Sequence, residues 1–322
     1  MPEFAFATSP TGLEPALKLD VARRRPELRF AYSRPGLVTW KAPGPVRDDD
    51  APGSVFAHVW GRSIGAARDA EAARQLIAPL GAAHVHVFAR DPETNAELAP
   101  WTELDAGAPV NRPARDGDGV ADVIVGAPGE PVWIGAHRHD PSRPAHPGGA
   151  IPVDVPPAAP SRAYAKLDEA IAWARLPVAS GQVALEIGAA PGGAALALAS
   201  RGLDVWAVDP GELAPHVAAL SNVHHLAVKV GALRWEQLPA RIDWLILDVN
   251  LAPQVALHEV ARLMPRLRAQ LRGAILTLKL NDWAFVGELP AFVERIREMG
   301  LPDVRLRHLP SNRREICAVA LR

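Results

Sequence analysis

The sequence predicts an α/β protein in which a doubly wound sheet forms the C-terminal half and a smaller α+β domain forms the N-terminal half. Three observations support this. Strands and helices alternate after residue 160, a glycine-rich turn joins a strand to a helix at 188–193, and a proline-rich segment separates the halves. A chain of 322 residues with 48% hydrophobic residues is long enough to build two cores.

The proline-rich segment covers residues 141–160 and reads PSRPAHPGGAIPVDVPPAAP. Seven prolines and a Gly-Gly pair are incompatible with a helix or a central strand. We expect an extended linker here. The predicted domains are therefore 1–140 and 161–322.

Short strands and helices alternate in the N-terminal half. Apolar runs predict strands at 4–8, 28–33, 36–41, 55–60, 83–89, 121–127 and 132–138. Helical spacing occurs at 12–25 and 66–79, and Ser9 or Thr11 is the expected cap of the first helix. The run Asp48–Asp50 is expected to be a solvated turn.

The C-terminal half has the longer, more regular alternation of a doubly wound sheet. We expect helices at 162–175, 195–202, 254–272 and 286–299, with a further helix after residue 209. Strands are expected at 183–189, 204–209, 224–230, 244–249 and 274–280, followed by a terminal hairpin of 304–309 and 315–321.

Composition restricts the class of protein. No apolar run approaches the ~18–20 residues of a membrane span, and the opening residues lack the pattern of a signal peptide. Cys317 is the only cysteine, which excludes an intrachain disulfide. We expect a cytoplasmic protein with no membrane association. The net charge of −1 gives no global support for nucleic-acid binding, so any basic face must be local.

The glycine-rich turn LEIGAAPGG (185–193) is the sharpest local motif. A helix begins directly after it, and its first N–H groups face whatever lies above the turn. Glycines permit a tight turn and close approach of a ligand. The candidate cofactor-binding residues are Gly188, Ala190, Pro191, Gly192 and Gly193. An ordinary βα loop is the alternative; a dinucleotide-binding loop is disfavoured because the GxGxxG spacing is absent.

Polar residues end three of the predicted strands. Asp209 could accept hydrogen bonds from a ribose diol, as in dinucleotide folds. Asp248 and Lys279 also lie near carboxyl ends of strands, where open α/β sheets bind ligands, although each alone could be a solvated strand end. Lysine is rare here, since five of the 35 basic residues are lysines and 30 are arginines.

Several motifs together resemble one known family. The stretch APSRAYAKLDEA (159–170), the turn LEIGAAPGG, Asp209, LDVN, LTLKL and RREICAVAL are similar to the FtsJ-like RNA ribose 2′-O-methyltransferases. The resemblance implies a Rossmann-like methyltransferase domain and S-adenosylmethionine as cofactor, with Asp248 also near the cofactor. It also implies a catalytic tetrad of Lys166, Asp248, Lys279 and Glu315.

Within that family, the chain is most similar to the RlmM type. The segment GLEPALK (12–18) resembles the start of a THUMP-like RNA-binding domain. The implied function is 2′-O-methylation of a cytidine ribose in large-subunit (23S) rRNA or its precursor, by a cytoplasmic monomer. The alternatives are a non-catalytic RNA-binding or ribosome-assembly factor and, less favoured, a methyltransferase acting on a base.

The chemistry of the tetrad follows from its residue types. A ribose hydroxyl must lose its proton during attack, and arginine does not deprotonate in proteins. Lysine can act as a base if burial or a neighbouring cation lowers its pKa. We assign Lys279 as general base, with Lys166 lowering its pKa, Asp248 orienting the amines and Glu315 holding the lysines or the ribose.

Three positions depart from the family pattern. Ala190 replaces a cysteine that is common in RlmM-type sequences, Val230 replaces an acidic residue expected near the adenine, and Ala163 occupies a possible cofactor contact. These departures concern cofactor binding more than catalysis.

Other candidates have plainer interpretations. A metal site at His137–Asp140 is disfavoured, because adjacent strand residues point to opposite sides; a solvated or RNA-facing edge is expected. His224 and His225 are expected in a loop and strand start. Trp283 could stack on the target base or cap a helix. Phosphate contact and solvation are both open for Arg307, His308, Arg313 and Arg314, whereas core packing is expected for Trp40, Trp60, Trp133, Trp206 and Trp244.

Overall fold

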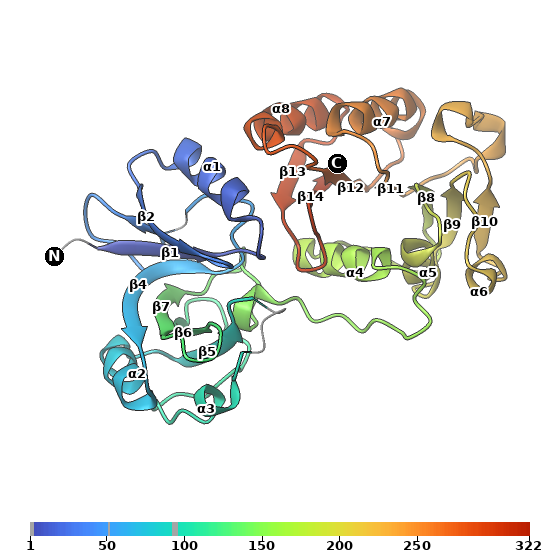
Figure 1. Cartoon of the computed structure of the whole chain (residues 1–322). Coiled ribbons are helices and arrows are strands. Elements are labelled where there is room, and N and C mark those ends of the chain that lie inside the picture. Colours follow the sequence, from blue (N-terminus) through green and yellow to red (C-terminus); the bar gives the residue numbers. More distant parts are fainter. Residues whose placement is uncertain (1–2, 51, 92–95) are drawn as a thin grey trace. The chain divides into compact units, whose positions relative to one another are not determined.

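The computed structural model describes residues 3–50, 52–91 and 96–322 and divides into two compact units between Pro152 and Val153 (Figure 1). The first part of the proline-rich segment packs into the first unit. Arg143 is buried there and donates a hydrogen bond of 2.7 Å to the carbonyl oxygen of Trp60. The segment expected to be a linker therefore begins inside the first unit.

The first unit is built on a seven-stranded sheet. Its strands are β1 (Phe4–Thr8), β2 (Arg29–Arg34), β3 (Leu37–Lys41), β4 (Trp60–Ala67), β5 (His84–Ala89), β6 (Gly119–Val125) and β7 (Val132–Arg138). The order is β2-β3-β1-β4-β7-β6-β5; only β5 and β6 pair in parallel. The helices are α1 (Glu14–Arg24), α2 (Ala70–Ile77) and α3 (Ala99–Thr102). This is a mixed α+β unit.

The strand predicted at 55–60 is wrong. Residues 55–59 form turns, and β4 begins only at Trp60. The Ser54 hydroxyl accepts from the N–H of Phe56, while the N–H of His58 donates to the Thr8 carbonyl at the end of β1. Phe56 and Val59 are buried all the same. The prediction failed because apolar residues in a loop that faces the core produce the same run of hydrophobic residues as a buried strand.

The predicted helix cap is also wrong. Helix α1 starts after Leu13, without a side-chain cap from Ser9 or Thr11. Glu14 organises this end instead: its carboxylate accepts hydrogen bonds from the N–H groups of Gly12 (2.8 Å) and Gly36 (2.6 Å). One acidic side chain thus connects the helix start to the β2–β3 turn.

The second unit holds another seven-stranded sheet, in the order β10-β9-β8-β11-β12-β14-β13. Its strands are β8 (Val183–Ile187), β9 (Asp204–Val208), β10 (Val223–Leu226), β11 (Trp244–Leu247), β12 (Gly273–Lys279), β13 (Asp303–Arg307) and β14 (Glu315–Leu321). The first five pair in parallel, and β14 lies antiparallel between β12 and β13. The predicted doubly wound, Rossmann-like α/β sheet with a terminal hairpin is confirmed.

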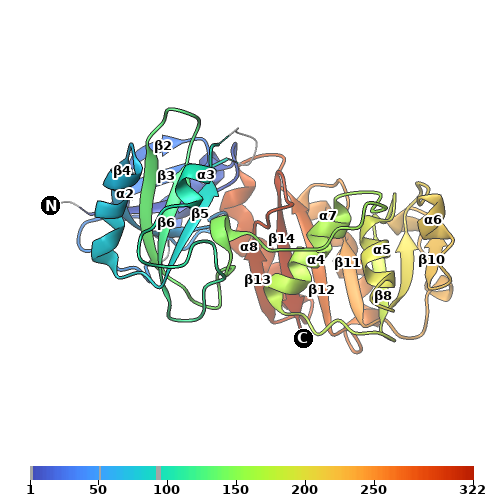
Figure 2. The ribbon, with the colours of Figure 1, turned by 90° about the horizontal axis from the view of Figure 1, so that it is seen from below.

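Helices cover both faces of this second sheet (Figures 1 and 2). Helices α4 (Ala163–Ala174) and α5 (Gly193–Ala199) lie on one face, and α7 (Pro253–Leu267) and α8 (Phe285–Glu298) lie on the other. The short helix α6 (Pro215–Ala218) precedes β10. Because both faces are covered, the central strands are mostly nonpolar, and Glu186 in β8 is an exception.

Burial of the tryptophans matches the prediction in part. Trp40, Trp60 and Trp244 are buried, but Trp133 and Trp206 are only partly buried. Within the described ranges, no helix is both long enough and apolar enough to cross a membrane.

The packing of β7 against β1 gives a stability prediction. A Cβ added to Gly135 would lie 2.3 Å from Cε1 of the fully buried Phe6 ring, whereas at Gly119 the nearest atom would be 4.0 Å away. Gly135→Ala should lower the free energy of unfolding by about 1–3 kcal/mol through overpacking. The matched Gly119→Ala variant should change it by less than about 0.5 kcal/mol. Urea unfolding measures both; equal effects would contradict this packing.

Candidate active site

The glycine-rich turn lies where β8 ends and α5 begins, and its shape depends on missing side chains. Gly188 and Gly192 have φ values of +86° and +107°, in the region that favours glycine. A Cβ on Gly188 would lie 2.3 Å from the carbonyl oxygen of Asp248, and one on Gly193 would lie 2.3 Å from Oγ of Ser161. The turn therefore packs closely against the end of β11 and against the start of α4.

Asp209 follows β9 and holds the turn from the neighbouring strand. Its Oδ2 accepts a hydrogen bond from the N–H of Ala190 (3.1 Å), and Oδ1 accepts one from the N–H of Gly211 (2.7 Å). Each carboxylate oxygen has a second lone pair. Asp209 thus positions the turn while retaining acceptor capacity for a ligand.

The four residues of the predicted tetrad come together in a closed ion-pair network. Nζ of Lys166 lies 2.8 Å from Oδ2 of Asp248 and 2.6 Å from Oε1 of Glu315. Nζ of Lys279 lies 3.0 Å from Oδ1 of Asp248 and 2.5 Å from Oε2 of Glu315. Each lysine contacts both carboxylates, and each carboxylate gives one oxygen to each lysine. With all four groups ionised, the network carries no net charge.

Different elements bring these four side chains together. Lys166 comes from α4, Asp248 directly follows β11, Lys279 ends β12 and Glu315 begins β14. Lys279 and Glu315 are direct partners in the antiparallel β12–β14 register. The side chains are only 6–17% exposed, so the ion pairs are poorly screened by solvent.

The expected lowering of the Lys279 pKa is wrong for this arrangement. Burial acts to lower the pKa of Lys279, but its hydrogen bond to Glu315 and the nearby charge of Asp248 outweigh burial, so the pKa is raised. Lys166 was expected to dominate as a neighbouring cation. Instead, two carboxylates stand between the lysines. Lys279 is therefore protonated at neutral pH.

Glu315 shows the complementary effect. Burial acts to raise the pKa of this carboxyl group, but hydrogen bonds from Lys166 and Lys279 outweigh burial, so the pKa is lowered. The network thus keeps Lys279 and Glu315 in their ionised forms.

Glu186 is a polar residue near the turn that we missed in the sequence. It lies in β8, is 1% exposed, and its Oε2 has no hydrogen-bond partner among the described residues. Burial, with the charges of Asp248 and Asp209 nearby, raises its pKa well above the usual value. An acidic residue inside the apolar run VALEI was the available sequence signal.

A small cavity of 20 Å³ lies beside Lys166 and Asp248. Thr277, Asn312 and Cys317 are among its lining residues. The volume is enough for about one water molecule. Cys317 is buried there, and burial raises the pKa of its thiol to about 12, so it is no thiolate nucleophile at neutral pH.

The remaining predicted contacts are less definite. Ala163 starts α4 and Val230 starts a short 3₁₀ turn, and neither brings a polar side-chain group. Trp283 is half-buried, and the Arg314 guanidinium lies 4.6 Å from its ring centroid. The ring that we considered for stacking on a target base therefore has a cation over it.

Two expectations about solvated histidines are wrong. His137 is buried, and its Nδ1 lies 2.6 Å from Oδ2 of the fully buried Asp122; His139 is buried as well. Arg307 and His308, expected on a solvated or phosphate-binding hairpin, are also buried. His224 and His225 both lie within β10, and His225 contacts the Asp209 carbonyl. In the described ranges, no cluster of three or more His, Cys, Asp or Glu is arranged to hold a metal.

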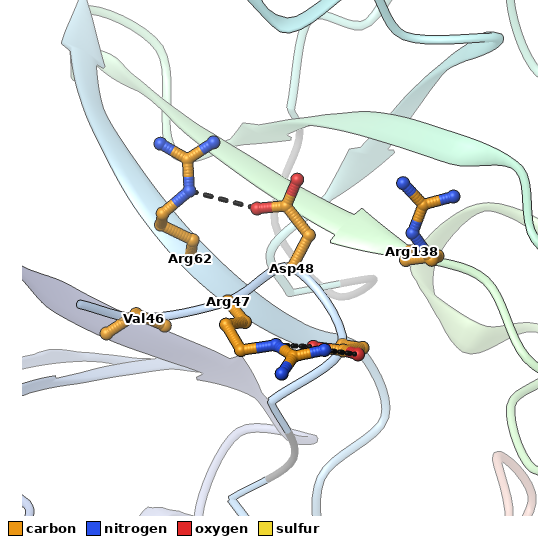
Figure 3. A pocket seen from close by; sticks show the side chains of 6 residues that line it. Val46, Arg47, Asp48, Arg62 and Arg138 are labelled. Carbon is orange, nitrogen blue, oxygen red and sulfur yellow. Dashed lines mark hydrogen bonds and ion pairs between the residues drawn. The ribbon is translucent and has the colours of Figure 1, made fainter.

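The first unit has an open polar hollow lined by three arginines (Figure 3). Nε of Arg62 donates to Asp48 (2.9 Å), and Arg47 forms a two-point contact with Asp49. Arg138 donates a hydrogen bond to the Gly117 carbonyl. The turn expected to be solvated is therefore an ion-paired turn, and its carboxylates neutralise two of the three arginines.

The buried His308 makes stability depend on pH. Burial lowers the pKa of His308 to about 4, although its hydrogen bond to the Arg313 carbonyl acts in the opposite direction. Below about pH 6.5 the unfolded chain binds a proton that the folded chain excludes, so stability falls as pH decreases. This group should remove about 2 kcal/mol between pH 7 and pH 5.

Unfolding in urea at several pH values measures this loss. His308→Gln keeps a hydrogen-bond donor but cannot titrate, so its free energy of unfolding should fall less over the same range. Parallel curves for the two proteins would contradict the assignment.

Comparison with known proteins finds sequence relatives among the ribosomal RNA large subunit methyltransferases M. The chain is 35% identical over 223 residues to the ribosomal RNA large subunit methyltransferase M of Alkalilimnicola ehrlichii, covering 63% of this chain and 59% of the relative. The protein of that name from Halorhodospira halophila is 40% identical over 141 residues, covering 42% of this chain and 39% of the relative. The chain thus matches about two fifths to three fifths of these relatives' lengths. No protein-family model matches it.

Similarity to solved structures is weaker. The match to TrmN from Thermus thermophilus covers 99% of this chain and 100% of TrmN. Its sequence identity is 16% and its TM-score is 0.37. The match to magnesium protoporphyrin IX methyltransferase from Synechocystis, solved with bound SAM, covers 50% of this chain and 80% of that protein. Its sequence identity is 16% and its TM-score is 0.37. Likeness at this level says nothing about activity. The sequence relatives confirm the resemblance to the RlmM type: over up to 63% of its length, this chain is related to the ribosomal RNA large subunit methyltransferases M.

Proposed function

We propose that this protein is an S-adenosylmethionine-dependent methyltransferase that modifies a ribose 2′-hydroxyl, that of a cytidine, in large-subunit (23S) rRNA or its precursor. The closed network of Lys166, Asp248, Lys279 and Glu315 beside the glycine-rich turn carries this proposal. The relatives' names support the substrate class.

The residues around the turn fit a methyl donor of this kind. The positive φ angles of Gly188 and Gly192 permit the tight turn, and Asp209 retains acceptor capacity for a ribose diol. Asp248 offers a negative charge to a sulfonium. When bound, S-adenosylmethionine supplies an electrophilic methyl group. The buried Glu186, whose Oε2 is unpartnered, lies in the strand below the turn.

The four network residues have distinct roles in this proposal. Lys279 removes the proton from the 2′-hydroxyl. Lys166 holds the ribose oxygen and also pairs with Asp248 and Glu315. Asp248 orients both amines, and Glu315 fixes the lysine geometry from β14. Alignment of the hydroxyl with the methyl group for in-line displacement supplies the rest of the acceleration.

The raised pKa of Lys279 sets a condition on this role. At neutral pH, Lys279 becomes a base only when the attraction of Glu315 and Asp248 for its ammonium group is weakened. A cation near Asp248 acts in this direction, because the carboxylate then shares its charge among three partners, the two lysines and the added cation. Binding of a positively charged donor would thus prepare the base.

In this proposal, the first unit binds the RNA substrate and positions it for methyl transfer. Its α+β architecture and the segment 12–18 are compatible with a THUMP-like module, which is part of the proposal. We also propose a cytoplasmic monomer whose two domains correspond to the two units.

The proposal predicts methyl transfer that depends on a titratable lysine. Wild-type protein should transfer labelled methyl groups from S-adenosylmethionine to rRNA lacking the modification. Lys279→Arg keeps the charge but cannot deprotonate, so transfer should fall by about 10²-fold or more. Mass spectrometry of nuclease digests would locate the methyl group on a ribose.

Binding of the donor provides the control. Calorimetry should show similar donor affinity for the wild type and Lys279→Arg. Donor binding without transfer to any rRNA would sink the proposed substrate. No donor binding at all would favour a non-catalytic RNA-binding or assembly factor, an alternative compatible with Val230 and the net charge of −1.

The pH dependence of single-turnover transfer tests the base. Because the pKa of Lys279 is raised, the deprotonated fraction is small at neutral pH and grows with pH. The rate should rise by about tenfold per pH unit below that pKa. Glu315→Gln removes the charge that helps raise this pKa, so the rise should level off at a lower pH. A flat profile would exclude Lys279 as the base.

A further inference from the structure

One face of the edge ribbon β2–β3 in the first unit carries exposed cationic and aromatic groups beside the buried side chains of Leu37 and Thr39. A bulge between Phe30 and Tyr32 shifts the pairing, so that Arg29, Tyr32 and Arg34 pair with Lys41, Thr39 and Leu37. Paired strand residues share a face. Since Leu37, Thr39 and Lys41 alternate along β3, all six side chains lie on one face. We call Arg29, Tyr32, Arg34 and Lys41, with Trp133, the Tyr32 face.

The bulge determines which residues meet on this face. In an unbroken strand, Arg29 would share a face with Ala31 and Ser33, and not with Tyr32 and Arg34. The extra residue instead puts two arginines and a tyrosine together. Bulges often re-aim side chains in this way near functional surfaces.

The cations of the Tyr32 face are not neutralised. Arg29, Arg34 and Lys41 are exposed, and among the described residues none of them forms an ion pair. Arg29 and Lys41 are direct cross-strand partners, an arrangement in which like charges repel. The arginines in the hollow of Figure 3 differ, because Asp48 and Asp49 pair with Arg62 and Arg47. The positive charge of the Tyr32 face is therefore complementary to a polyanion.

The aromatic groups of this face are already stacked. Tyr32, 37% exposed, lies with its ring centroid 5.6 Å from that of Trp133, at an interplanar angle of 11°. The Trp133 indole is fixed by a hydrogen bond of 2.9 Å from Nε1 to Oγ of Ser63. The Arg34 guanidinium lies 5.4 Å from the Tyr32 ring centroid. These three planar groups, two from β2 and one from β7, form a small platform.

We propose that the Tyr32 face binds single-stranded RNA. A nucleobase stacks on Tyr32 or on the guanidinium plane of Arg34, and phosphates contact Arg29, Arg34 and Lys41. A folded protein or a membrane surface does not need planar stacking groups beside unpaired cations, whereas single-stranded RNA uses both. The proposal rests on the proposed function for its choice of RNA and adds the surface that holds the substrate.

The test is equilibrium binding of the full chain to a fluorescein-labelled oligouridylate of about ten nucleotides, a length within the usual site size. Tyr32→Ala should weaken binding by about 5- to 100-fold, because it removes a stacking platform. Tyr32→Phe keeps the ring and should bind within about twofold of wild type.

Charge is tested separately by Arg29→Ala/Arg34→Ala. Loss of two phosphate contacts should reduce the slope of log affinity against log salt by about 1.4. The matched control is Arg112→Ala/Arg115→Ala, which removes two exposed arginines of the same unit from the segment before β6. This control should leave the salt slope and affinity nearly unchanged.

Three outcomes would overturn the proposal. Wild-type affinity for Tyr32→Ala would do so, as would equal effects of the two double variants. Concentration-dependent dimerisation that Tyr32→Ala abolishes, with RNA binding intact, would assign the face to a second copy of the chain.

Donor calorimetry and methyl transfer on the same variants separate this proposal from the proposed function. Loss of oligouridylate binding in Tyr32→Ala, from a chain that transfers no methyl group, supports the face and removes the function. If the chain transfers methyl groups and Tyr32→Ala leaves RNA binding unchanged, the proposed function is supported and the Tyr32 face is excluded as the RNA-binding surface.

Discussion

The closed network of two lysines and two carboxylates is the constraint on which the rest of the second unit depends. Each of its four charges is largely removed from water, and removing one partner would leave an uncompensated charge. The network therefore requires α4, β11, β12 and β14 to be placed together to within a hydrogen-bond length. The direct pairing of Lys279 with Glu315 shows why the antiparallel strand matters: it brings a carboxylate to the carboxyl end of a parallel strand.

The glycine-rich turn is coupled to that network by contact. Gly188 lies against the backbone of Asp248, and Gly193 lies against Ser161 just before the helix that carries Lys166. A side chain at Gly188 would push the end of β11 away from the turn, and one at Gly193 would push the start of α4 away. The turn thus lies directly against the elements that carry Asp248 and Lys166, which places it next to the charged side chains.

Electrostatics in this protein are local. The net charge of −1 is the sum of very different local distributions. One unit holds a neutral buried network, and the edge ribbon of the other carries cations that have no ion-pair partner among the described residues. The raised pKa of Lys279 shows the same point at a smaller scale. The lysine's nearest ionised neighbours are carboxylates, and these decide its protonation state more than the second lysine does.

Sequence alone determined the class and order of most elements, because hydrophobic periodicity and turn residues are local properties. It also identified the four network residues, since the motifs around Lys166, Asp248, Lys279 and Glu315 resemble those of one family. Tertiary structure decided what local patterns cannot encode. It showed that Phe56 and Val59 belong to a buried loop, that His137 and His308 lie in the core, and that two carboxylates separate the lysines. The bulge that gathers Arg29, Tyr32 and Arg34 on one face was likewise not visible in the sequence, because pairing register depends on the neighbouring strand.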